Sequence, residues 1–215
     1  MKNLLFAYNQ ILTFSGEQHF NDPKSGVDVF IRHKDGYTIV EAFYTEGVWP
    51  SIDWRTNFRF LFTKWKRPDC ARPDSKIKVH GGYFNGWAAI RERVLTAVDG
   101  DKVLVCGLSM GGGLASIIAV DIQYNKNPPE LYCFDFDGPK VWNKAGRDSF
   151  NKRVPNAYKI KNGNDIVTKV PPGYYYAGKK IHIGSPEHWW KFSIVDHNYF
   201  RNYKQILTDL TKIPD

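Results

Sequence analysis

The chain is 215 residues long and carries 30 Lys and Arg against 22 Asp and Glu, a formal net charge of +8. This length predicts a single domain over residues 1–215, and the 42% of hydrophobic residues are enough for a packed core. No run approaches the roughly 20 apolar residues of a membrane-spanning helix, so we expect no transmembrane segment.

The first expected element is an amphipathic helix over residues 2–14. Asn9 and Gln10 interrupt its apolar run, and no small-residue cleavage site follows, so the segment differs from a secretory signal peptide. The three cysteines are an odd number without metal-ligand spacing, and two of them fall in expected core strands. Reduced cysteines and the missing signal pattern predict a cytoplasmic location, or release by a route other than the usual secretory one.

A hairpin comes next, and strands then alternate with helices through the centre of the chain. This alternation indicates an α/β fold with a central, mostly parallel sheet, helices on both faces and an antiparallel edge hairpin. The expected strands are residues 27–33, 37–43, 76–80, 103–106, 131–136, 157–161 and 179–183. Helices are expected over residues 83–98, 114–122 and 198–210, with a short helix or turn over 54–65.

The most informative segment is Gly107-Leu108-Ser109-Met110-Gly111, between a buried strand and a helix of small residues. The pattern G-x-S-x-G in this context is typical of a nucleophile elbow, a sharp turn that lifts a serine hydroxyl above the sheet. The chain passes close to itself there, so Gly107 and Gly111 can carry little more than a hydrogen. The helix start supplies backbone N–H groups that suit an oxyanion. We therefore predict Ser109 as a catalytic nucleophile, with a structural glycine turn as the alternative.

A serine nucleophile needs a base, and the base needs a carboxylate to orient it. In the elbow fold the chain order is serine, acid, histidine. Asp165 lies in a loop at the carboxyl end of an expected strand, where the functional sites of parallel sheets gather, although it could be a plain turn residue. Asp135 and Asp137 also stand out, but Asp135 lies inside a strand. His197, near the start of an expected helix, is the preferred base. The alternative bases are His80, His182 and His188.

Several segments, in the same order along the chain, resemble the class 3 lipase family, the fungal triacylglycerol lipase type of the α/β-hydrolase fold. The family's Val-His-x-Gly-Phe resembles residues 79–83, and its Phe-Gly-x-Pro-Arg-Val-Gly-Asn resembles residues 136–143. Its Asn-x-x-Asp-Pro-Val-Pro-x-Leu-Pro-Pro segment resembles residues 162–172, and its late Asp-His-x-x-Tyr resembles residues 196–200. The resemblance runs from about residue 37 to 203. It implies a triad of Ser109, Asp165 and His197.

Two departures from the family concern the segment that supplies half of the oxyanion hole and the lid that follows it in family enzymes. The family's Phe-Arg-Gly is here Phe43-Tyr44-Thr45-Glu46, without the arginine and the glycine. We predict that the backbone N–H of Met110 and one near Thr45 hold the oxyanion. Family enzymes carry a lid between this segment and an Asp-Trp motif, which is Asp53-Trp54 here. Only residues 47–52 lie between the two, so a lid is expected to be short or absent. The residues expected to wall the substrate groove are Trp49, Ile52 and Tyr174, with loop packing as the alternative for the tyrosine.

These residues predict a serine ester hydrolase for lipid or short-chain acyl esters, including phospholipid esters, that works through an acyl-enzyme without a metal or organic cofactor. A non-catalytic binding protein that retained the fold is the alternative, supported by the altered oxyanion segment. A nucleic-acid binder rests on charge alone. The basic cluster between residues 64 and 78 accompanies no nucleic-acid motif, so we expect no specific nucleic acid, although the charge would suit an anionic surface.

Overall fold

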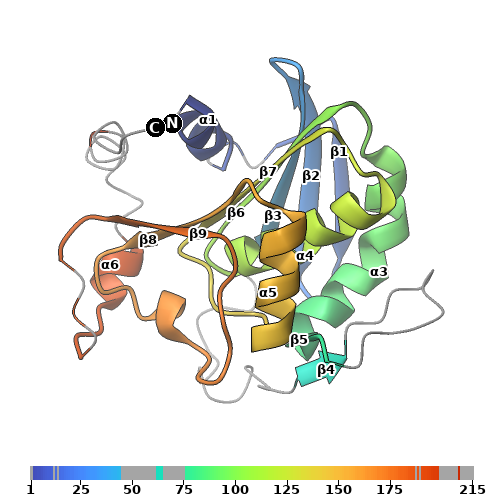
Figure 1. Ribbon diagram of the computed structural model, residues 1–215. Helices are drawn as coiled ribbons and strands as arrows, with labels where there is room; N and C mark the ends of the chain where they lie inside the picture. Colours follow the sequence, from blue (N-terminus) through green and yellow to red (C-terminus); the bar gives the residue numbers. More distant parts are fainter. Residues whose placement is uncertain are drawn as a thin grey trace.

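The structure is a computed structural model, and it describes residues 2–11, 13, 15–44, 62–64, 76–186, 188, 190–198 and 208 (Figure 1). Most of the two segments expected as helices over 54–65 and 198–210 lies outside these ranges. The expectation of a single domain over the whole chain likewise stays a prediction.

A seven-stranded sheet forms the centre of the fold, in the spatial order β1-β2-β3-β6-β7-β8-β9. Antiparallel pairing joins β1 (Gln18–Asp22), β2 (Val27–Lys34) and β3 (Tyr37–Tyr44). Parallel pairing joins β3 to β6 (Lys102–Leu108), β7 (Glu130–Phe136), β8 (Ala157–Asn162) and β9 (Lys179–Ile183). The expected mostly parallel sheet with an antiparallel edge hairpin is therefore confirmed. The carboxyl ends of its parallel strands all lie at the same end of the sheet.

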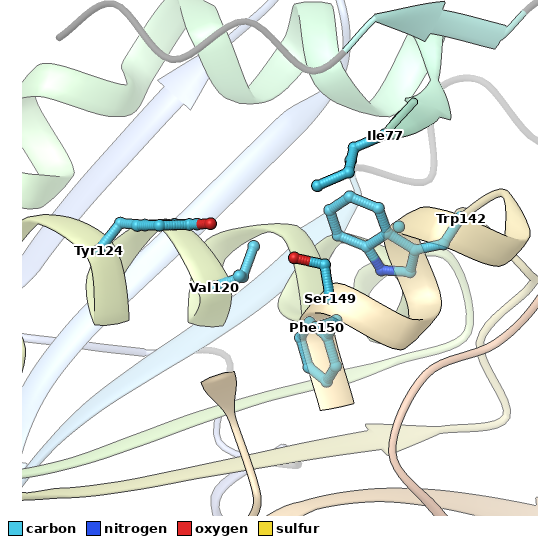
Figure 2. Close-up of a pocket in the computed structure, with 7 residues that line it drawn as sticks. Ile77, Val120, Tyr124, Trp142, Ser149 and Phe150 are labelled. Carbon is cyan, nitrogen blue, oxygen red and sulfur yellow. The ribbon is translucent and has the colours of Figure 1, made fainter. Parts of the chain in front are cut away.

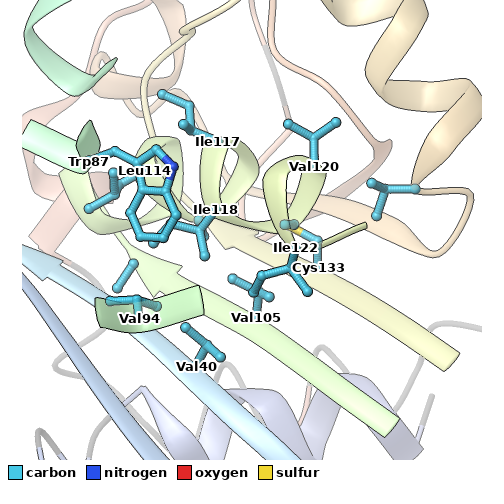
Figure 3. Packing of buried hydrophobic residues seen from close by; sticks show 14 of the residues in the cluster. Val40, Trp87, Val94, Val105, Leu114, Ile117, Ile118, Val120, Ile122 and Cys133 are labelled. Atoms are coloured by element: carbon cyan, nitrogen blue, oxygen red, sulfur yellow. The ribbon is translucent and has the colours of Figure 1, made fainter. Parts of the chain in front are cut away.

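Helices cover both faces of this sheet, as Figure 1 shows. On one face lies α1 (Lys2–Gln10), and on the other lie α3 (Gly81–Ala97), α4 (Met110–Asn125) and α5 (Lys144–Arg153). The period-two alternation of β6 serves both layers. Val103 and Val105 pack in the cluster with α3 and α4, whereas Leu104 and Cys106 pack in the cluster with α1. Figure 3 shows Val105 beneath α4 in the first of these clusters.

The central helix α4 is buried along nearly its whole length, from residue 111 to residue 122. It contacts β3, β6 and β7, and glycine, alanine and serine in its first turns allow its backbone to approach the sheet closely. A helix buried this completely between the sheet and its neighbours has little freedom to move. Its N-terminus therefore fixes the position of the residue that precedes it, Ser109.

Helix α1 ends at Gln10 and not at residue 14, because a buried arginine binds the chain there. The Arg32 guanidinium donates to the carbonyl oxygens of Gln10 at 2.7 Å and Ser15 at 2.6 Å. It also pairs with the Glu41 carboxylate at 2.8 Å. This network satisfies carbonyls at the helix end and attaches the segment to β2 and β3.

The strand expected at residues 76–80 exists but does not join the main sheet. It is β5 (Lys78–His80), which pairs antiparallel with β4 (Phe62–Lys64) in a separate two-stranded sheet. Over residues 62–64 the expected helix or turn is therefore wrong, because pairing with a partner distant in sequence overrides the local pattern. The short helix α6 (Ile194–Asn198) follows β9.

Candidate active site

Ser109 lies in the tight turn between β6 and α4, with φ 54° and ψ −125°. Its backbone N–H donates to the carbonyl oxygen of Phe136 at 2.8 Å, which ties the turn to the end of β7. A Cβ on Gly107 would lie 2.3 Å from the carbonyl oxygen of Gly111, and one on Gly111 would lie 2.2 Å from that of Ala42. Both positions therefore require glycine, and the turn has the geometry of a nucleophile elbow.

Replacing Gly111 with alanine should lower the thermal unfolding midpoint by about 3–10 °C. The added methyl group must displace backbone of β3, and such overpacking costs about 1–3 kcal/mol. Gly82→Ala is the matched control, because the nearest atom to its added Cβ is 3.4 Å away and alanine favours the helix it lies in. Thermal melts followed by circular dichroism test both variants. Equal midpoints for the two would contradict the close approach at the elbow.

The three residues expected as a triad are in contact. The Ser109 Oγ lies 2.9 Å from the His197 Nε2, and the His197 Nδ1 lies 2.8 Å from the Asp165 Oδ2. The Asp165 side chain is fully buried, and its Oδ1 accepts the backbone N–H of Val167 at 2.8 Å. With the proton on Nδ1, the imidazole donates to the carboxylate and its Nε2 accepts the serine hydroxyl. This arrangement can remove a proton from Ser109 and hold the resulting imidazolium.

Two polar residues that the sequence analysis did not assign hold the acid and the base together. The Asp196 Oδ2 accepts the backbone N–H of Asn164 at 2.7 Å, so α6 is bound to the loop that carries Asp165. The Asn162 Nδ2 donates to the carbonyl oxygen of Asp196 at 2.7 Å. Asp196 directly precedes His197 and Asn162 lies three residues before Asp165, both in segments that resemble the family, and this position was the signal that could have identified them.

The other candidate histidines have different surroundings. His80 is buried against the rings of Tyr83 and Tyr174, with ring centroids 5.1 and 5.5 Å away, and burial lowers its pKa to about 4. The His182 Nε2 lies 3.3 Å from the carbonyl oxygen of Gly163. The ring of His188 packs at 5.1 Å from that of Trp190. Among the described histidines, the one within hydrogen-bonding distance of the Ser109 hydroxyl is His197.

Asp135 belongs to a buried ion pair behind the elbow. Its Oδ1 accepts from the Lys159 Nζ and from the backbone N–H of Gly138, both at 2.8 Å. Burial raises the pKa of its carboxyl, while the Lys159 charge opposes that shift. A Cβ on Gly112 would lie 2.2 Å from the Asp135 Oδ1, so the pair packs directly under the first turn of α4. Asp135 therefore packs against the first turn of α4, next to the elbow, and is not in contact with His197.

The remaining predicted site residues fall into two groups. Met110 begins α4 directly after Ser109, so its N–H is among those that lack an intrahelical partner. Tyr174 is buried, 4% exposed, and packs on His80. The residues that lie outside the described part of the chain are Thr45, Trp49 and Ile52.

A small apolar pocket lies on the α4–α5 side of the molecule and has no triad residue in its lining (Figure 2). Its walls include Val120 and Tyr124 of α4, Phe150 of α5 and Trp142. It is therefore distinct from the contacts around Ser109.

Comparison with known proteins identifies the family. A family model described as Lipase (class 3) matches residues 46–175, which is more than half of the chain. The chain belongs to the class 3 lipase family. This family member is 26% identical to secreted mono- and diacylglycerol lipase 1 of Fusarium solani, over 157 residues that cover 68% of the chain and 43% of the relative. It is 34% identical to a chloroplastic phospholipase A(1) of Arabidopsis thaliana, over 88 residues that cover 38% of the chain and 20% of the relative.

Solved lipase structures share the fold of this family member. The triacylglyceride lipase of Rhizomucor miehei superposes with a TM-score of 0.67 at 18% identity, covering 78% of this chain and 65% of that one. A triacylglycerol lipase of Penicillium expansum superposes with a TM-score of 0.67 at 17% identity, covering 83% of this chain and 74% of that one. The α/β-hydrolase fold that the resemblance implied is therefore confirmed.

The chain spans less than half the length of these two curated relatives, 43% of the fungal lipase and 20% of the plant enzyme. No helix in the described ranges is long and apolar enough to cross a membrane. The cytoplasmic location stays a prediction, and the fungal relative is by name a secreted protein.

Proposed function

We propose that this class 3 lipase family member is a serine ester hydrolase that cleaves lipid or short-chain acyl esters through an acyl-enzyme. The observation that carries the proposal is the continuous line of contacts from the Ser109 hydroxyl through His197 to Asp165, at 2.9 and 2.8 Å. A buried carboxylate, an oriented imidazole and a hydroxyl in an elbow at a helix start are the parts that acyl transfer requires.

The first half of the reaction forms the acyl-enzyme. The Ser109 Oγ attacks the ester carbonyl carbon while the His197 Nε2 takes the hydroxyl proton, and Asp165 stabilises the imidazolium. The negative oxygen of the tetrahedral intermediate accepts the Met110 N–H, and we propose a second donor near Thr45. The bond to the leaving oxygen then breaks, and the imidazolium gives its proton to the departing alcohol.

The second half repeats the chemistry with water. His197 takes a proton from a water molecule, whose oxygen attacks the acyl carbonyl of the Ser109 ester. Collapse of the second tetrahedral intermediate releases the carboxylic acid and returns the proton to the Ser109 Oγ. Each step uses side chains and backbone N–H groups of this chain.

The substrate class proposed is a glycerolipid or another accessible acyl ester. The named relatives act on mono- and diacylglycerols and, in the plant, on phospholipids. Large apolar side chains are exposed in the segment just before His197, with Trp190 56%, Phe192 63% and Val195 71% exposed. An exposed apolar group of this kind, next to the base and on a chain of net charge +8, suits contact with a lipid surface of anionic character.

Labelling with a fluorophosphonate tests the proposal directly. The reagent forms a phosphorus–oxygen bond with an activated serine hydroxyl and releases fluoride. We expect one label per chain, on the peptide that contains Ser109, and none on Ser109→Ala. A folded chain that takes no label, and hydrolyses no short-chain ester, would instead be a binding protein that retained the fold.

Hydrolysis of dissolved and emulsified esters should follow one ordinary saturation curve. Residues 47–52, where the family carries its lid, are too few for a lid helix of two turns plus hinges, roughly ten residues. Long-chain triacylglycerols are then expected to be poorer substrates than short-chain esters. The rate measured through the solubility limit of tributyrin tests this. A sharp rise at that limit would show that another segment, such as residues 63–75, acts as a cover.

A further inference from the structure

Asp137 is a second buried acid beside the triad, and the mechanism above does not use it. It directly follows β7, and its side chain is fully buried. Its φ of 50° is in the left-handed region, which is uncommon for a residue with a Cβ. Its backbone N–H donates to the carbonyl oxygen of Ile160 at 2.9 Å. A buried carboxyl on a restricted backbone is unfavourable in free energy, and residues of this kind cluster at functional sites.

One carboxyl oxygen of Asp137 holds a residue on which both triad partners depend. The Asp137 Oδ1 accepts the buried backbone N–H of Asn162 at 2.8 Å. The carbonyl oxygen of Asn162 accepts the backbone N–H of Asp165 at 3.1 Å, and its Nδ2 donates to the carbonyl oxygen of Asp196 at 2.7 Å. Asp137 therefore acts, through Asn162, on the loop of the acid and on the helix of His197.

The hydrogen-bond donors around the two carboxyls decide which of them keeps its charge. Both Asp165 oxygens receive donors at 2.8 Å, one from His197 and one from the backbone of Val167. Asp137 receives one donor, and its Oδ2 is buried without a hydrogen-bond partner among the described residues. Because donors favour the ionised form, the charge belongs on Asp165. Burial raises the pKa of Asp137 well above its ordinary value, and the charge of Asp165 raises it further.

The charge of Lys159 does not reverse this assignment. Lys159 lowers the pKa of Asp137, but burial has the larger effect. Its ammonium is bound to the Asp135 carboxylate at 2.8 Å and also to the carbonyl oxygen of Gly138. The charges that act on the pKa of Asp137 are those of Asp165 and Lys159. The other charged and titratable side chains on the elements around it are Glu130, Tyr132, Cys133 and Asp135 of β7, Tyr158 and Lys161 of β8, and Asp196 and His197 of α6.

We propose that Asp137 is a positioning residue of the triad that works as a neutral carboxylic acid, so that the Asp137–Asp165 pair holds one proton and one charge. The catalytic part of this inference rests on the proposed function. A single charge next to His197 is what orients and stabilises the imidazolium. A second charge in the same buried space would repel the first and loosen the Asn162 contacts.

Thermal unfolding against pH tests the protonation state without any assay of activity. A carboxyl whose pKa is raised by folding stabilises the fold below its unfolded pKa of about 3.9, and this stability is lost as pH rises toward the folded value. The amide introduced by Asp137→Asn does not titrate. Above about pH 4, the melting midpoint of that variant should therefore rise relative to that of the wild type by about 3–5 °C per pH unit.

The control for this experiment is Asp101→Asn, which makes the same replacement at an exposed aspartate. If the difference in melting midpoint between Asp137→Asn and the wild type stayed constant from pH 5 to pH 8, the one-proton pair would be wrong. Should that variant not fold, the ¹³C shift of the Asp137 carboxyl in the wild type decides instead. A shift typical of an ionised carboxylate at pH 7 would overturn the proposal.

Ester hydrolysis tests the positioning role. Asparagine keeps an oxygen that accepts the Asn162 N–H, so kcat of Asp137→Asn should stay within about threefold of the wild type. Asp137→Ala leaves that buried N–H without an acceptor, and kcat should fall about tenfold or more with KM little changed. Asp137→Gly, which suits φ 50°, replaces the alanine variant if it does not fold. Unchanged kcat without the acceptor would refute positioning. A wild type that hydrolyses no ester would refute the proposed function, while the pH test of the pair stands.

Discussion

Replacing Ser109 with alanine is expected to lower kcat for a short-chain p-nitrophenyl ester on the order of a millionfold. In a triad of this type the attacking hydroxyl and its base act as a unit, so loss of the hydroxyl removes almost the whole chemical step. The rate acceleration that the variant retains comes from substrate binding and from the backbone N–H groups at the start of α4. Steady-state rates of the purified, folded variant measure the loss, and activity equal to the wild type would rule out the mechanism.

A glycine at the same position separates lost chemistry from lost folding. The φ of 54° and ψ of −125° at Ser109 are unfavourable for a residue with a Cβ, by about 1–3 kcal/mol. Ser109→Gly should therefore be inactive and yet melt at a midpoint equal to or a few degrees above that of the wild type, after the entropic penalty of glycine. Ser149→Ala, a serine in α5 away from the triad, is the control and should keep full activity. A large fall in the midpoint of Ser109→Gly would contradict the strained elbow.

The hairpin and the central strands could be predicted because their patterns are local. The expected ranges 27–33 and 37–43 match β2 (Val27–Lys34) and β3 (Tyr37–Tyr44) to within one residue. A tight Asp-Gly turn joins two runs rich in β-branched residues there, with positive φ at both Asp35 and Gly36. Such signals depend on neighbouring residues alone, so the sequence is sufficient to find them.

Two elements could not be predicted because their stability is tertiary. β1 (Gln18–Asp22) is a polar edge strand whose residues are exposed or half-buried, and it exists through its pairing with β2. α5 (Lys144–Arg153) buries only Gly146 and Phe150, so it has no apolar stripe. Its one local signal was Asn143, whose side chain caps the helix by accepting the Gly146 N–H at 2.8 Å.

The candidate site shows the same division. Ser109 and the glycines around it could be predicted from a strand, a turn and a helix in sequence. The contact between Ser109 and His197 joins residues 88 positions apart, and sequence reasoning alone left three other histidines open. Asp137 and Asp165 are both buried acids after parallel strands. Only the fold shows that Asp165 reaches the base while Asp137 binds the backbone of Asn162.

Replacing His197 with alanine should be as damaging as replacing Ser109, on the order of a millionfold in kcat, whereas His188→Ala should stay within about threefold of the wild type. The His197 Nε2 is 2.9 Å from the Ser109 hydroxyl, while the ring of His188 packs against Trp190. The two variants are well matched, because both remove an imidazole from the same stretch of chain near the exposed apolar side chains. An inactive His188→Ala together with an active His197→Ala would show that the base is His188 and that the assignment of His197 is wrong.

Combining the changes tests whether the triad residues act together. Ser109→Ala/His197→Ala should lose little beyond either single variant, because each alone already disables the same proton transfer. Asp165→Asn should fall less far, about ten-thousandfold, since it leaves the attacking hydroxyl and the base in place and disturbs only the tautomer and orientation of the ring. If the fold-losses in kcat of the two single variants multiplied in the double variant, Ser109 and His197 would contribute separately to catalysis. The hydrogen bond between them would then be a feature of the resting structure and not the path of the proton.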